Sequence, residues 1–338
     1  MTEIYQSDRI DEAAQQLREG KLVAFPTETV FGLGAIANND QAVQSVYRVK
    51  GRPSDNPLIV HLAQPSDLFD YVQDLTADQI HWVKKLQAAF WPGPLTLILP
   101  VKEGVFAPTV TGGLDTVGLR MPDHPLTLKL IKAVGFPLVG PSANLSGKPS
   151  PTKLDHVRHD FDGKIAGILA SQPTRIGVES TVLDLSDPRG LFILRPGQIG
   201  KEQIEAVLEG VKVSYPDQLT VEADQQPKAP GMKYRHYSPQ QTVYAVTADR
   251  MAEVIQDHAD QAIFCAGREA CLAGLPELAQ TYSLGPSLET ATQRLFDALR
   301  VADDSQGIDL ILVEWIDEGE SSAGYRNRLK KASVQVFD

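Results

Sequence analysis

A break in the hydrophobic pattern near residue 216 limits this chain to folds with two separate cores. Between Pro216 and Gln241 the residues Asp, Gln and Pro are frequent, and no apolar periodicity remains. A structureless stretch of this length is uncommon in a compact domain unless it is functional. The total of 338 residues also exceeds the usual size of one domain. We therefore predict a first domain over residues 1–214, a linker over 215–241 and a second domain over 242–338.

The first domain contains many short apolar runs with few helices between them. Leu22–Phe25, Val117–Met121 and Leu191–Arg195 are examples, and a proline follows each of them. Strands that follow one another directly are typical of a mixed sheet with helices packed on it, rather than of a strict alternation. The stretch Thr27–Ala35, which is rich in hydroxyls and contains two glycines, is predicted to be a loop.

In the second domain, unlike the first, the predicted strands and helices alternate along the chain. Strands are predicted near residues 243–246, 262–266, 280–284 and 308–315, with helices near 248–258, 287–302 and 321–331. This order is typical of a small α/β domain with a largely parallel sheet. The predicted fold class is therefore α/β: a twisted mixed sheet with flanking helices, followed by a smaller Rossmann-like domain.

Two neighbouring cations, Lys50 and Arg52, are conspicuous because the chain is acidic, with a net charge of −11. Such a charge argues against a protein coated with nucleic acid, although a cleft can still carry the opposite sign. Pro53 favours an extended backbone at Arg52, which helps the two side chains converge on one anion. Taken alone, however, a Lys-x-Arg pair is more often a solvated turn.

Two further arginines favour an anion site over that turn. Arg120 interrupts an apolar run, and Arg195 ends another run just before Pro196. Arginine binds phosphate and carboxylate through two parallel hydrogen bonds. Neutral donors occur on similar loops, although singly each could serve a turn or a helix cap: Thr27, Thr29, Ser142, Asn144, Ser146, Ser150, Ser180 and Thr181. The alternative for Arg120 is a local salt bridge to Asp115 or Asp123. Without a Ser-His-Asp arrangement, the set favours positioning of an anionic small molecule over covalent acyl chemistry.

Several other sequence patterns resemble known binding or targeting motifs but are incomplete. Gly32-Leu33-Gly34 lacks the third glycine of a dinucleotide fingerprint, and Gly147-Lys148 lacks the rest of a phosphate-binding loop. His156 and His159 lack a third strong ligand nearby, which favours a surface helix over a metal site. Two cysteines give no disulfide framework, the acidic N-terminus does not resemble a signal peptide, and no apolar run is long enough to span a membrane. We expect a cytoplasmic protein.

The motifs in their order resemble the YrdC-domain family, in its long two-domain form. Eight segments in the first domain carry the resemblance: Pro26–Leu33, Lys50–Pro53, Pro57–Leu58, Trp91–Thr96, Arg120–Pro122, Pro141–Gly147, Ser180–Val182 and Leu194–Gly197. The linker of the long form is matched by Pro230–Pro239. Phe31 replaces a tyrosine that is frequent in the family, so a role for that hydroxyl is lost.

The resemblance implies an adenylate-forming enzyme. L-Threonine, bicarbonate and ATP would give threonylcarbamoyl-AMP and pyrophosphate, with Mg²⁺ carried by the ATP and no metal ligand from the protein. The product would pass to a tRNA threonylcarbamoyl-transferase complex that modifies the adenosine next to the anticodon of ANN-reading tRNAs. No membrane and no stable nucleic-acid partner are expected.

The resemblance also assigns residues. Lys50, Arg52 and Asn56 would hold the phosphates, with Lys50 and Arg52 as the catalytic cations. Ser142, Asn144, Ser150 and Arg195 would hold the nucleotide, and Tyr237 of the linker would close over it. Thr29, His61, Arg120 and Thr181 would hold threonine, with Arg120 facing its carboxylate. The ending Asn327-Arg328-Leu329 is typical of the family, but no chemistry is assigned to the second domain.

Two other functions compete with this one. A YrdC-type sheet could bind RNA, but the acidic charge and the lack of a basic aromatic stripe weigh against that function. YrdC domains also occur in hydrogenase-maturation enzymes that make another carbamoyl-adenylate. The zinc-finger cysteines and acylphosphatase segment of those enzymes are missing here.

Overall fold

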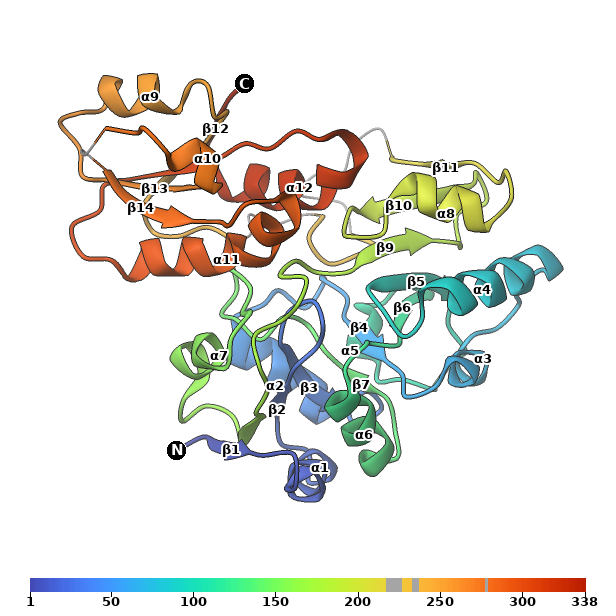
Figure 1. Ribbon diagram of the computed structural model, residues 1–338. Helices are drawn as coiled ribbons and strands as arrows, with labels where there is room; N and C mark the ends of the chain where they lie inside the picture. Colours follow the sequence, from blue (N-terminus) through green and yellow to red (C-terminus); the bar gives the residue numbers. More distant parts are fainter. Residues whose placement is uncertain (217–226, 233–236, 277–278) are drawn as a thin grey trace.

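The computed structural model describes residues 1–216, 227–232, 237–276 and 279–338 (Figure 1). Within these ranges the strands form two sheets, which confirms the predicted α/β fold class. The larger sheet has eleven strands in the order β1-β8-β2-β3-β7-β4-β6-β5-β9-β10-β11, and the smaller has five in the order β14-β13-β15-β12-β16. The larger sheet lies between Glu3 and Ser214 and the smaller between Thr242 and Phe337. Of the predicted linker over 215–241, residues 217–226 and 233–236 lie outside the described ranges.

The larger sheet mixes parallel and antiparallel pairs. For example, β4 is parallel to β6, whereas β5 is antiparallel to β6. Its strands are β1 (Glu3–Tyr5), β2 (Val23–Phe25), β3 (Gly32–Ile36), β4 (Ile59–His61), β5 (Leu95–Pro100), β6 (Thr116–Arg120), β7 (Leu138–Val139), β8 (Gly167–Leu169), β9 (Thr181–Asp184), β10 (Leu191–Arg195) and β11 (Val213–Ser214). Its helices are α1 (Ile10–Arg18), α2 (Asp40–Lys50), α3 (Leu68–Tyr71), α4 (Ala77–Phe90), α5 (Pro108–Thr111), α6 (Pro125–Val134), α7 (Leu154–Phe161) and α8 (Lys201–Val207).

Strand β3 corrects the predicted loop over 27–35. It pairs antiparallel to β2, with Gly32 opposite Phe25 and Gly34 opposite Val23. A Cβ atom on Gly32 would lie only 2.9 Å from the Phe25 ring, so the ring occupies the space that a side chain would need. Glycine weakens an ordinary strand but suits one that another group approaches closely. The prediction holds for residues 27–31 but was wrong for residues 32–35, because it used the local preference of glycine and could not see Phe25.

Alternate residues of these strands supply two apolar layers. Val23 and Phe25 pack with buried residues of α1 and α6, while Ala24 packs in the main core with Leu33 from β3. Burying both faces in this way stabilises the sheet by about 25 cal/mol for each Å² of apolar surface. The strand ends therefore lie at fixed positions, and several of them border the site described below.

All pairs in the smaller sheet are parallel. Its strands are β12 (Thr242–Val246), β13 (Ile263–Gly267), β14 (Ala279–Ser283), β15 (Leu310–Glu314) and β16 (Gln335–Phe337), and its helices are α9 (Met251–Asp257), α10 (Glu269–Leu272), α11 (Leu288–Asp304) and α12 (Ala323–Ala332). Helices α11 and α12 share one apolar cluster, and α9 and α10 share another. The predicted alternation of strands and helices thus corresponds to a parallel sheet with helices on both faces.

Helix α11 also faces the first domain (Figure 1). Asp297 accepts a hydrogen bond from Lys153 at 2.7 Å and lies 3.1 Å from His156, and Arg300 pairs with Asp160 at 2.8 Å. His156 therefore lies in the domain interface, which the prediction of a surface helix did not foresee, whereas the His159 side chain on the same helix is 66% exposed, in line with that prediction. The described residues contain no group of three or more His, Cys, Asp or Glu placed to hold a metal ion. Among them, moreover, no helix combines the length and apolar character needed to cross a bilayer.

Candidate active site

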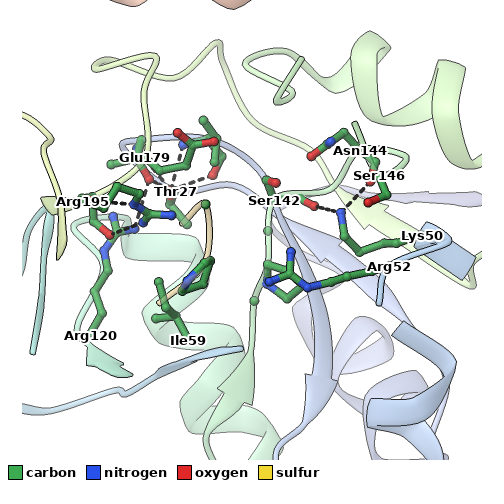
Figure 2. Close-up of a pocket in the computed structure, with 18 of the residues that line it drawn as sticks. Thr27, Lys50, Arg52, Ile59, Arg120, Ser142, Asn144, Ser146, Glu179 and Arg195 are labelled. Carbon is green, nitrogen blue, oxygen red and sulfur yellow. Dashed lines mark hydrogen bonds between the residues drawn. The ribbon is translucent and has the colours of Figure 1, made fainter. Parts of the chain in front are cut away.

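One cavity collects most of the predicted site residues at the ends of the central strands of the larger sheet (Figure 2). The segments around β4, β6 and β9, the end of α2, and residues 230, 231 and 237 of the linker contribute to its wall. The lining residues are Thr27, Thr29, Val30, Gly32, Lys50, Arg52, Ile59, His61, Arg120, Gly140, Pro141, Ser142, Asn144, Ser146, Gly147, Glu179, Ser180, Arg195, Pro230, Gly231 and Tyr237.

Lys50 is the last residue of α2 and lies at one end of the cavity. The helix stops there because Gly51 adopts a left-handed backbone with a φ of 61°, which glycine tolerates well. The buried ammonium of Lys50 donates to the carbonyls of Ser142 and Asn144, at 2.5 Å each. Burial, with a further contribution from Arg52, holds the pKa of Lys50 well below its usual value. This cation is therefore held by neutral oxygen atoms in the described structure.

Arg52 lies beside Lys50 on the segment that leads to β4. Its guanidinium donates to the backbone carbonyls of Asn56 and Pro57, at 3.3 and 3.1 Å. The side-chain oxygens of Asn56 and Asn144 are buried and have no hydrogen-bond partner in the described structure. Unsatisfied buried oxygens are costly unless a ligand or water completes them. This end thus combines two cations with two amide groups that can still accept a hydrogen bond.

Arg120 ends β6 at the other end of the cavity (Figure 2). It pairs with the buried carboxylate of Glu28 at 2.6 Å and donates to the Thr29 hydroxyl at 3.1 Å. Its Nε atom donates to the carbonyl of Gly93 at 3.2 Å. A salt bridge was indeed one alternative for Arg120, but its partner is not the Asp115 or Asp123 considered from the sequence.

His61 follows directly on the same side of the cavity, at the end of β4. It is buried, and its Nδ1 atom has no hydrogen-bond partner in the described structure. Burial and the nearby Arg120 lower the pKa of His61 to about 3, so the imidazole is neutral at physiological pH. A neutral ring with an open nitrogen can bind a hydroxyl or an amine without adding charge.

A third wall is formed by Glu179, Ser180 and Arg195. Arg195, at the end of β10, donates to the carbonyl and to the hydroxyl of Ser180, at 3.1 Å each. Glu179 accepts hydrogen bonds from Ser150 at 2.5 Å and from Arg328 of α12 at 2.6 Å. Burial would raise the pKa of Glu179, but Arg328 and Arg195 together bring it down to about 2. Glu179 is therefore ionised although it is buried.

Tyr237 brings the linker to the cavity. It has a φ of 66°, is 5% exposed, and packs on Phe296 of α11 with ring centroids 4.9 Å apart. The guanidinium of Arg328 lies 5.9 Å from the centre of the same ring. Tyr237 is thus in contact with the second domain on one side and borders the cavity on the other.

Nine of the twelve predicted site residues line the cavity, and three lie just outside its wall. The nine are Thr29, Lys50, Arg52, His61, Arg120, Ser142, Asn144, Arg195 and Tyr237. The backbone carbonyl of Asn56 accepts a hydrogen bond from Arg52, and the hydroxyl of Ser150 donates one to Glu179. The hydroxyl of Thr181 donates to the carbonyl of Ile199 at 2.7 Å and accepts from its N–H at 3.1 Å. Thr181 therefore fixes the turn after β10 in this structure.

Sequence reasoning missed Glu28, Glu179 and Arg328 as parts of this site. Glu28 lies between two of the hydroxyl residues that were selected, and Glu179 directly precedes Ser180. Arg328 belongs to the Asn-Arg-Leu ending that was noted without a role. A search for buried carboxylates able to compensate Arg120 and Arg195 would have pointed to the first two.

The mixed sheet, the cavity at its strand ends and its four basic residues define an α/β protein whose cavity is suited to anionic small molecules. Residues 15–197 match the family described as "Telomere recombination", the Sua5/YciO/YrdC family. Residues 199–334 match the family described as "Threonylcarbamoyl-AMP synthase, C-terminal domain". The chain belongs to the threonylcarbamoyl-AMP synthase family in its two-domain form, whose members are adenylate-forming nucleotidyltransferases.

Individual relatives support this membership over nearly the whole chain. The threonylcarbamoyl-AMP synthase of Bacillus subtilis is 47% identical, with 96% of this chain and 93% of the relative covered. That of Pyrococcus abyssi is 43% identical, with 96% of each covered. The crystal structure of P. abyssi Sua5 complexed with L-threonine has a TM-score of 0.91 and 41% identity, and covers 99% of both chains.

Proposed function

We propose that this chain makes L-threonylcarbamoyl-AMP and pyrophosphate from L-threonine, bicarbonate or its CO₂, and ATP. The observation that supports this most strongly is the presence of two different cationic centres in one cavity. Lys50 and Arg52 form one centre and Arg120 the other. The first suits a polyanion such as a triphosphate, and the second, already paired with Glu28, suits a small amino acid. The P. abyssi relative was solved in complex with L-threonine, which supports an amino acid as one of the two substrates.

The proposed reaction has two bond-forming steps. The amine of threonine attacks CO₂ and loses a proton, which gives a carbamate. A carbamate oxygen then attacks the α-phosphorus of ATP, and the bond to the β-phosphate oxygen breaks to release pyrophosphate. In-line displacement of this kind depends mainly on positioning and on charge stabilisation. Lys50 and Arg52 would stabilise the negative charge that develops on the phosphates.

The remaining residues would orient the two substrates. We assign Ser142, Asn144 and Arg195 to the nucleotide, with Asn56 and Ser150 supporting the phosphate and nucleotide ends from behind. Arg120 would bind the carboxylate of threonine, while Thr29 and His61 would receive its other polar groups. Thr181 would act through the turn at Ile199, because its hydroxyl is occupied there.

Magnesium fits this site as a companion of ATP. Mg²⁺ prefers oxygen ligands and usually keeps several waters while it binds substrate phosphates. Glu179 is the one carboxylate among the described residues that line the cavity, and it is engaged by Arg328 and Ser150. We therefore propose that the phosphates bring Mg²⁺ with them and that no side chain is dedicated to it. When bound, the ion would neutralise part of the triphosphate charge.

We further propose that the linker is a lid. Pro230, Gly231 and Tyr237 border the cavity, and Lys331 of α12 donates to the carbonyl of Gly231. A closed linker would exclude water from a labile mixed anhydride. The product would then pass to a tRNA threonylcarbamoyl-transferase complex acting next to the anticodon of ANN-reading tRNAs. A cytoplasmic location is part of the proposal and fits the free thiols of Cys265 and Cys271.

Incubation of the protein with ATP, Mg²⁺, threonine and bicarbonate tests the function. We expect pyrophosphate release that requires threonine, and an adenylate that contains the threonine carbon atoms. A chain without residues 227–240 should still bind threonine but should release a larger share of the adenylate, which then hydrolyses. If pyrophosphate release does not need threonine while RNA binds tightly, the RNA-binding alternative is correct. Full retention of the adenylate after the deletion would refute the lid.

A further inference from the structure

Among the side chains by which the second domain reaches the wall of the cavity, Arg328 of α12 is fully buried and makes charged contacts with two segments of the first domain. Its Nε atom donates to the carboxylate of Glu179 at 2.6 Å, and its Nη2 atom donates to the backbone carbonyl of Glu179 at 3.1 Å. Its Nη1 atom donates to the carbonyl of Pro196 at 2.7 Å. The planar fork of an arginine is suited to fixing several acceptors at once. One side chain thus holds two segments of the first domain.

The two segments that Arg328 holds are those that carry the third wall of the cavity. Glu179 lines the cavity and accepts the Ser150 hydroxyl, while Pro196 follows directly on Arg195. The same guanidinium lies over the ring of Tyr237, the linker residue at the cavity. The contacts of Arg328 therefore lead to three of the groups assigned above to the nucleotide: Ser150, Arg195 and Tyr237.

We propose that Arg328 is a positioning residue for the nucleotide. It acts through Glu179 and Pro196 and makes the second domain a functional part of the ATP site. This inference rests on the proposed function, because it takes the ligand of that wall to be ATP. Without Arg328, Glu179 would lose its ion pair and keep the hydrogen bond from Ser150, and the carboxylate could turn toward Arg195 or toward the cavity. Either movement would displace a group that the nucleotide needs.

The alternative is that Arg328 only fastens the two domains together. The chain offers a matched control for that role in Arg300 of α11. Arg300 is also buried and pairs across the same interface, with Asp160 at 2.8 Å and with the carbonyl of Pro149 at 2.7 Å. Neither Arg300 nor Asp160 is among the residues that line the cavity. If Arg328 only held the two domains together, its substitution would therefore affect ATP binding as much as the substitution of Arg300 does.

The experiment compares Arg328→Gln with Arg300→Gln in the full-length protein. Binding of ATP with Mg²⁺ is measured by calorimetry in the absence of threonine, so that no turnover is needed, and the fold is checked by circular dichroism and thermal unfolding. We expect Arg328→Gln to weaken ATP binding by about tenfold or more, because hydrogen bonds to charged groups are lost. Arg300→Gln should lower the melting temperature but weaken ATP binding less than Arg328→Gln does, because it reaches the nucleotide residues through the Pro149 carbonyl next to Ser150 and not through Glu179.

A conservative variant guards against misfolding. Arg328→Lys keeps the positive charge but cannot donate to all three acceptors, so we expect an ATP affinity between those of the wild type and Arg328→Gln. Equal ATP affinity in the wild type and both Arg328 variants would overturn the inference and leave the proposed function intact. An equal loss of ATP affinity in Arg328→Gln and Arg300→Gln would show that both arginines only hold the two domains together. A wild-type chain that binds no ATP would overturn the proposed function, and the inference with it.

Discussion

The two ends of the cavity hold their cations in different ways. Lys50 is surrounded by backbone carbonyls, which accept its hydrogen bonds without cancelling its charge. Arg120 is paired with the carboxylate of Glu28, so the pair is neutral as a whole. A centre with uncancelled charge attracts a polyanion, whereas a neutral pair accepts an amino acid that itself carries both signs. The electrostatics of each end thus match one of the two proposed substrates.

The difference also separates ligand binding from stability. A buried ion pair leaves an uncompensated charge when one partner is removed, and that loss is strongly destabilising. A cation held by carbonyls leaves only polar groups, which a water molecule can satisfy. Substitutions at the two ends should therefore have different effects on folding even where both abolish turnover.

The largest effect on catalysis should come from Arg52→Ala at the carbonyl-held end. Loss of a charge-stabilising donor costs about 10² to 10³ in turnover. Stability should change by only about 1 kcal/mol, because Arg52 is half-buried and donates to the carbonyls of nearby Asn56 and Pro57. Steady-state pyrophosphate release and thermal unfolding give the two numbers. Arg48, an exposed arginine on the preceding helix α2, provides the matched control, and Arg48→Ala should change neither number. Normal turnover in Arg52→Ala would remove Arg52 from the site.

Arg120→Gln should affect both properties. We expect the KM for threonine to rise by about 10-fold to 100-fold, since the carboxylate loses its charged partner. The free energy of unfolding should fall by about 3–5 kcal/mol, because Glu28 is left charged and buried. The double variant Arg120→Gln with Glu28→Gln should regain most of this stability without regaining threonine affinity. If the double variant stays as unstable as the single one, the pair is not the reason for the loss.

The sequence was sufficient for the parts of the fold that depend on local signals. Runs such as Leu191–Arg195 have the observed bounds because the apolar pattern and the following proline act at short range. Helix α6 (Pro125–Val134) likewise depends on local signals, because Pro125 stands at its first position and Gly135 caps its end. Strand β3 could not be predicted in this way, because its glycines are explained by Phe25 on the neighbouring strand.

In the site, too, residues with a local sequence signal were predicted and residues that depend on distant contacts were not. Its basic residues were found from the sequence because each interrupts an apolar or Gly-Pro context, which is a local signal. The carboxylates that balance them were not found, because their partners are distant in the chain. Glu179 meets Arg328 across 149 positions. Such a pair depends on how two domains dock, and no local pattern predicts that.

The smallest effect is a dependence of ATP binding on pH, which arises from Lys50. Burial and Arg52 hold its pKa well below 10.5 in the empty site, and a triphosphate beside it would raise that pKa again. Between these two pKa values, ATP binding must take up a fraction of a proton, so ATP affinity should fall as the pH rises through that window.

The same group also affects folding, because the unfolded chain keeps the Lys50 proton up to about pH 10.5. This group therefore destabilises the empty protein at lower pH, and that cost disappears as the pH approaches 10.5. Calorimetry at a series of pH values below 10.5, in buffers of different ionisation enthalpy, measures the uptake, which Lys50→Met should abolish. A binding heat that is the same in every buffer would show that Lys50 does not change its protonation when ATP binds, and would refute the predicted proton uptake.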